Sequence, residues 1–203
     1  MNLIIIATTA IVLYLIVTIW LSYQILIPEN SRIEQSRKFL LISVPALLLH
    51  AIVLYQLINT EIGLDMGFYN ALSLVSWVVY LLVILTSIIK TTTNLITIIS
   101  PMAAVALLLQ FVMPSTNVIS DGSNIGIDIH IVLSIAAYSF LTIAALQAII
   151  LAIQEHQLRI KHPVKIMRIF PPMQTIEDSL VQLLWIGFFL LSLGLVTGLM
   201  FVH

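Results

Sequence analysis

The sequence predicts an all-α fold: a polytopic membrane helix bundle of six transmembrane helices with both termini on the outer side. Of its 203 residues, 61% are hydrophobic and only 8% are charged, whereas a soluble domain usually carries about 25% charged residues. The apolar residues form six long runs, and the basic residues are confined to alternate gaps between those runs. The first two observations predict the helices, and the third predicts their orientation.

Each apolar run is long enough to span a bilayer. A transmembrane helix needs roughly 20 apolar residues to cross about 30 Å of hydrocarbon. The first run lacks the basic start of a signal peptide and its apolar part is too long, so it is interpreted as a span. The expected spans are Leu3–Ile27, Phe39–Leu57, Asn70–Ile89, Leu95–Met113, Ile131–Ile153 and Leu180–Val202. The capping-box spacings Ser31 to Glu34 and Thr175 to Asp178 predict that the second and sixth helices begin there.

The gaps between the spans differ in charge. All eight Lys and Arg residues fall in the first, third and fifth gaps: Arg32, Arg37, Lys38, Lys90, Arg159, Lys161, Lys165 and Arg168. Cytoplasmic loops retain Lys and Arg, so the odd gaps are expected inside and the even gaps outside. We expect a single transmembrane domain over residues 1–203, with the lipid bilayer as its partner. A net charge of -1 does not indicate a nucleic-acid-binding protein, which usually carries a basic surface. The absence of cysteine excludes disulfides and thiolate metal sites.

Small residues mark a packing face on the last span. Gly187, Gly194 and Gly198 lie on one side of it, and the last two form a GxxxG spacing. Such spacing allows close approach of two helices.

Three histidines are the candidate functional residues. His130 opens the fifth span and His203 closes the sixth. We expect both at the outer surface, at similar depth on antiparallel neighbouring helices, where they can approach one another. His130, Ser134 and Tyr138 follow an i, i+4, i+8 spacing and form a polar stripe that should face protein or a cavity. His50 lies within the second span, about 12 Å from its outer end. An ionisable group there is by default a functional hypothesis, although a structural hydrogen bond to a neighbouring helix explains it equally.

Two imidazoles on one membrane face suit several metals. Neutral imidazoles are axial ligands for haem iron, and they also bind Zn, Cu or Ni. The outer acidic residues Glu61, Asp65, Asp121 and Asp128 could complete a site for a harder metal, but they follow no ligand spacing. No Ser-His-Asp, P-loop, HExxH or Rossmann pattern is present, so no enzyme class is indicated.

Several motifs together resemble one known family. Residues 129–138 contain H-x-x-L-S-x-x-x-Y, residues 191–198 read L-x-L-G-x-x-T-G, and Leu48-Leu49-His50-Ala51 places a histidine within an early helix. These segments resemble the cytochrome c assembly family of the CcsA/CcmC type. The resemblance implies a non-enzymatic membrane protein of the bacterial cytoplasmic (inner) membrane that handles haem at the outer face.

The resemblance also implies roles for individual residues. His130 is similar to the first external haem-iron ligand, and His50 is similar to an internal relay ligand. His203 is a possible second ligand by its position rather than by the resemblance, and Ser134 and Tyr138 would orient the pocket. The implied partners are other cytochrome assembly subunits or a chain that supplies further helices. Neither even gap holds a Lys or Arg to pair with haem propionates, so backbone donors, Ser, Thr, Asn or a partner would have to do so.

An alternative interpretation is a subunit of a small-solute or ion transporter. Ser43, His50, Ser73, Ser76 and Tyr80 would line its path, next to helices that Pro45 and Pro101 should kink. A third is a structural membrane subunit without a ligand of its own.

Overall fold

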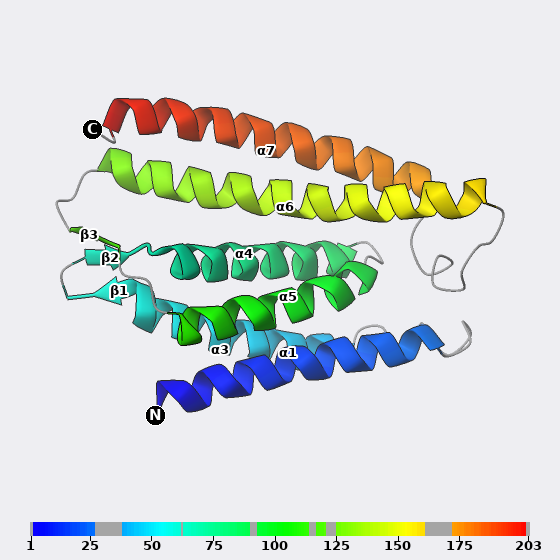
Figure 1. Cartoon of the computed structure of the whole chain (residues 1–203), viewed down its shortest axis with the longest axis horizontal. Coiled ribbons are helices and arrows are strands. Elements are labelled where there is room, and N and C mark those ends of the chain that lie inside the picture. The colour runs from blue at the N-terminus through cyan, green and yellow to red at the C-terminus, as the bar shows by residue number, and fades with distance from the viewer. Residues whose placement is uncertain are drawn as a thin grey trace. The chain divides into compact units, whose positions relative to one another are not determined.

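The computed structural model describes residues 2–26, 38–61, 63–89, 93–113, 117–120, 125–160 and 172–201. The elements are α1 (Leu3–Leu26), α3 (Leu40–Ile58), β1 (Asn59–Thr60), β2 (Gly63–Asp65), α4 (Phe68–Ile89), α5 (Thr93–Val112), β3 (Val118–Ser120), α6 (Ile125–Arg159) and α7 (Met173–Phe201) (Figure 1). All six of these described helices are long and apolar enough to cross a membrane. The predicted all-α membrane fold and its six spans are confirmed.

The last two helices are longer than predicted. The 35 residues of α6 extend over about 52 Å, against about 30 Å of hydrocarbon. Helix α6 therefore extends past the apolar layer of the membrane. Helix α7 begins at Met173, where the Thr175 N–H donates to the Pro172 carbonyl at 2.9 Å. The prediction that Thr175 caps this helix is wrong, because the turn has already begun at Pro172. The other expected cap, Ser31 to Glu34, lies outside the described residues.

The chain divides into two compact units, residues 1–121 and 122–203. The expectation of one domain over residues 1–203 stays a prediction.

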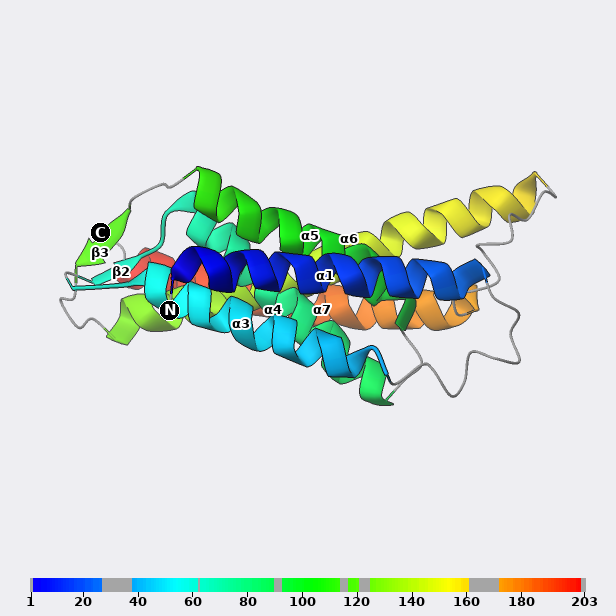
Figure 2. The same ribbon diagram turned by 90° about the horizontal axis from the view of Figure 1, so that it is seen from below.

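The first unit is a ring of four helices. Helix α1 packs against α3 and α5, and α4 packs against the same two helices (Figure 2). Its apolar core includes Ile6 and Ala10 of α1, Val53 of α3 and Leu107 of α5. Because consecutive helices in the ring are joined by short connections, they alternate in direction, as a chain crossing a membrane repeatedly must.

A small sheet, which the sequence did not predict, closes one end of the first unit. Strand β2 pairs antiparallel with β1 and with β3, so the α3–α4 connection lies beside the segment that follows α5. The buried Asp65 carboxylate strengthens this junction by accepting the backbone N–H groups of Gly67 at 3.0 Å and Asn117 at 2.9 Å. The second and fourth gaps therefore lie at the same end of this unit, as the charge pattern requires.

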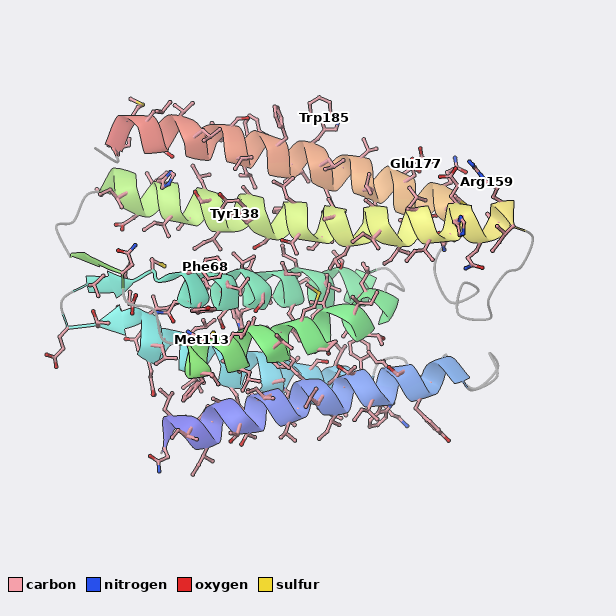
Figure 3. The ribbon with its side chains drawn as sticks, viewed as in Figure 1. Phe68, Met113, Tyr138, Arg159, Glu177 and Trp185 are labelled. Atoms are coloured by element: carbon pink, nitrogen blue, oxygen red, sulfur yellow. The ribbon has the colours of Figure 1, made fainter. Side chains whose placement is uncertain are left out.

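The second unit is an antiparallel hairpin of α6 and α7. Three close approaches give its register: Gly126 lies against Phe201, Gly187 against Leu141, and Gly198 against His130. The glycine face predicted for the last span does pack against its neighbour. The charged residues Arg159 and Glu177 lie at the end of the hairpin opposite His130, and Trp185 projects from α7 away from α6 (Figure 3).

Candidate functional site

The candidate site is centred on His130, in the second turn of α6. Its Nδ1 lies 2.8 Å from the Gly194 carbonyl oxygen of α7, and its side chain is half-buried. Its Nε2 has no hydrogen-bond partner among the described residues. The imidazole is thus fixed to the partner helix by one nitrogen only. It lies towards the end of the long helix and not at its middle, as expected for a residue near a membrane surface.

Three residues of one α7 face surround this imidazole. Gly194, Thr197 and Gly198 follow an i, i+3, i+4 spacing and so share a helix face. The Thr197 hydroxyl donates to the Gly194 carbonyl at 2.9 Å and lies 3.5 Å from the His130 Nδ1. A Cβ at Gly198 would lie 2.9 Å from the His130 Cε1 and 3.1 Å from its Nδ1. The imidazole ring therefore occupies space that only a glycine at position 198 leaves open. We call Gly194, Thr197 and Gly198 the histidine cradle.

The expected polar stripe faces α7 only in part. The Ser134 hydroxyl oxygen lies 3.5 Å from where a Cβ of Gly194 would be, so Ser134 faces the histidine cradle as His130 does. Tyr138 is 54% exposed. The eight residues from His130 to Tyr138 turn the helix face by roughly 80°, which carries the stripe away from α7. His130 and Ser134 are brought together at the site, and Tyr138 lies beside it on the outer surface of the hairpin.

The other ligand candidates predicted on this side are His203 and four acidic residues. His203 and Asp121 lie outside the described residues. Glu61 and Asp128 are exposed, and the Asp65 carboxylate is engaged in the sheet junction. Over the described ranges, no group of three or more His, Cys, Asp and Glu side chains is placed to hold a metal ion.

His50 lies in a separate, fully buried polar cluster of the first unit. Its Nδ1 lies 3.0 Å from the Tyr14 hydroxyl of α1, and its Nε2 lies 2.9 Å from the Ser73 hydroxyl of α4. The Tyr14 ring meets the imidazole edge to face at 5.8 Å. Both ring nitrogens are therefore satisfied by neighbouring helices, and the side chain has no exposed surface.

The other polar residues of the transporter interpretation extend the same cluster. Tyr80 donates to the Ser43 hydroxyl at 3.0 Å, and Ser76 donates to the Ser73 carbonyl at 2.8 Å. Ser43, Ser73 and Tyr80 are fully buried. The structure brings together the residues proposed to line a path, but they hydrogen-bond to one another, either between α3 and α4 or, for Ser76, within α4. This arrangement joins α3 to α4 and offers no unpaired polar lining for a solute.

Sequence reasoning missed three members of the candidate site. Gly194, Thr197 and Gly198 were visible in the L-G-x-x-T-G motif, but the glycines indicated only helix packing. Their signal lies in register: in an antiparallel hairpin, the start of α6 must meet the end of α7. That pairing brings His130 to the last turns of α7, but its partners among residues 194–198 could be identified only from the structure.

Comparisons with known proteins agree with the sequence motifs. The family model described as "Cytochrome C assembly protein" matches residues 38–203. The inner membrane protein YpjD of Escherichia coli K12 is 31% identical over 169 residues, which are 82% of this chain and 64% of that protein. An uncharacterized 28.8 kDa protein of Azospirillum brasilense is 34% identical over 86 residues, 42% of this chain and 32% of its own. The chain thus spans less than two thirds of the length of these relatives. No solved structure matches it.

Proposed function

This chain belongs to the cytochrome c assembly family, and from that premise we propose that it binds haem in the bacterial inner membrane. It would take part in cytochrome c assembly by delivering haem at the outer face or by regulating that delivery. It would act as a carrier and not as an enzyme. The observation that carries the proposal is His130, whose Nδ1 is hydrogen-bonded to the Gly194 carbonyl while its Nε2 is left without a partner among the described residues.

The donor chemistry of the site fits haem. Bound haem supplies an iron that accepts neutral imidazole as an axial ligand. In histidine ligands the second ring N–H commonly donates a hydrogen bond to a carbonyl or carboxylate, which orients the ring and raises the basicity of the ligating nitrogen. His130 has both features: one nitrogen hydrogen-bonded to a main-chain carbonyl and one unoccupied. Ser134 brings a hydroxyl group to the same site, and a hydroxyl can donate to a propionate where Lys and Arg are absent.

The other sequence candidates keep their proposed roles. His203 would be a second axial ligand, and Tyr138 would border the haem from the outer surface of α6. His50 would serve as an internal relay ligand only by giving up its hydrogen bond to Tyr14 or Ser73. Other cytochrome assembly subunits, or a chain that supplies further helices, would complete the binding surface.

The absorption spectrum of the purified protein tests this proposal. Protein made in haem-replete cells should show a Soret band, and His130→Ala should weaken it strongly because the axial ligand is lost. His156→Ala is the matched control, since His156 is an exposed histidine at the opposite end of α6. Its Soret band should equal that of the wild type. A colourless protein that also holds added haem no better than His130→Ala would reject the proposal.

A further inference from the structure

The bond between His130 and α7 fixes where the imidazole proton lies. A carbonyl oxygen only accepts hydrogen bonds, so at 2.8 Å the His130 Nδ1 must be the donor. A neutral imidazole carries one N–H, and its other nitrogen then carries the lone pair. Nε2 is therefore the basic nitrogen. It also lies farthest from Gly198 among the ring atoms near that residue: 3.7 Å from a Cβ built there, against 2.9 Å for Cε1.

From this geometry we infer that the histidine cradle is a positioning device. It holds His130 as the Nδ1-protonated tautomer and presents Nε2 as the ligating atom. Each member has its part: Gly194 supplies the acceptor, Thr197 donates to the same oxygen, and Gly198 leaves the space in which the ring lies. The inference rests on the proposed haem binding for the identity of the guest, but not for the state of the ring.

Whether the His130 Nε2 is free to bind iron then depends on how α6 and α7 pack. His130 and the histidine cradle belong to different helices, so the tautomer is set only when the hairpin is closed in this register. An imidazole without the carbonyl partner would exchange between tautomers, and part of its population would carry a proton on the nitrogen that iron needs. A small shift of α7 at Gly198 should therefore weaken ligation without removing any ligand atom.

Two variants separate positioning from packing. In Gly198→Ala the new methyl group would meet the imidazole, whereas in Gly187→Ala it would meet the Leu141 side chain at 2.8 Å. Both changes crowd the same hairpin by a similar amount, but only the first displaces His130. Ferric haem should bind about tenfold or more weakly to Gly198→Ala, as is typical when the group supporting a metal ligand is disturbed. Gly187→Ala should keep close to wild-type affinity.

The tautomer of His130 can be measured in folded protein that contains no haem. Full-length protein with ¹⁵N-labelled histidine, prepared haem-free in detergent micelles at a pH where imidazole is neutral, gives the ring nitrogen shifts. The His130 signals are assigned by their absence in His130→Asn. The expected result is protonation at Nδ1 in the wild type and in Gly187→Ala, with loss of that preference in Gly198→Ala.

Each result is decisive. A wild-type His130 protonated mainly at Nε2 overturns the inference. If the wild type binds haem, equal haem affinity in the two glycine variants overturns it as well. If Nδ1 is protonated but no variant, wild type included, holds haem, the positioning of the ring is upheld while the proposed function fails.

Discussion

At the scale of single residues, His50 shows how a polar group is accommodated within an apolar bundle. Its two nitrogens meet hydroxyl groups of α1 and α4, so one side chain on α3 connects three helices. A buried polar group without a partner costs free energy, and removing one member exposes the others to that cost. The cluster therefore favours one arrangement of the first unit over other packings of apolar helices.

The His50→Ala variant should lower the free energy of unfolding by about 2–4 kcal/mol, because it creates a cavity and leaves the Tyr14 and Ser73 hydroxyls unpaired. Thermal unfolding in detergent, followed by circular dichroism, measures the effect. Tyr55→Ala is the control: it removes a larger side chain from the same helix, but one that is 70% exposed. A His50→Ala protein as stable as Tyr55→Ala would contradict this account.

A milder change at the same cluster separates the hydrogen bond from the packing. Tyr14→Phe keeps the ring that lies edge to face with His50 and with Tyr80 at 4.8 Å. It should cost about 1 kcal/mol, the typical value of one interhelical hydrogen bond in a membrane protein. The same unfolding assay measures this effect. A loss of stability as large as that of His50→Ala would show that the hydroxyl group contributes more than one hydrogen bond.

The sequence predicted the location of these residues better than their partners. The apolar surroundings of His50 were enough to predict its burial. Its partners Tyr14 and Ser73 lie 36 and 23 positions away, on helices that are apolar on nearly every face. Hydropathy does not fix the rotation of such a helix, so the contacts could not be predicted from the sequence.

At the scale of elements, the α6–α7 hairpin is defined by its register. A Cβ at Gly194 would lie 3.9 Å from the Leu133 Cβ, close to the separation of about 3.8 Å found in disulfides. The chain has no cysteine, so an introduced pair can react only with itself. Leu133→Cys combined with Gly194→Cys should therefore form an intramolecular disulfide under mild oxidation, measured by mass spectrometry of proteolytic fragments.

The control for this crosslink shifts the first cysteine by one residue. Val132 is 65% exposed, and a shift of one residue turns the side chain by about 100° around the helix. Val132→Cys with Gly194→Cys should remain reduced under the same conditions. Efficient crosslinking of this pair would mean that the two helices meet in another register.

Element boundaries were predicted well only where polarity changes sharply. Helices α1, α3, α4 and α5 begin and end within two residues of the expected spans, because a proline or a polar residue follows each of them within two positions. Helices α6 and α7 continue past their apolar runs, since residues such as Gln154 and Glu177 are good helix formers. The strands are two or three residues long, too short for alternating hydrophobicity to reveal.

At the scale of the whole molecule, the distribution of Lys and Arg predicts which ends face the cytoplasm. Glu61 lies in the second gap and Arg159 at the end of α6, and both are exposed. In intact cells, a membrane-impermeant maleimide should label Glu61→Cys but label Arg159→Cys only after permeabilisation. The cysteine-free parent gives the background. The reverse labelling pattern would invert the topology and place His130 on the cytoplasmic side.

The use of a main-chain atom to hold His130 has a consequence for how this site tolerates genetic change. A supporting carboxylate is lost by one codon substitution, whereas every amino acid at position 194 still brings a peptide oxygen. Alanine scanning would therefore overlook the position, because a Cβ at Gly194 meets its nearest neighbours only at 3.5 and 3.9 Å and the peptide oxygen stays in place. Natural variants that exchange Gly194 for another small residue should therefore still hold the imidazole in place.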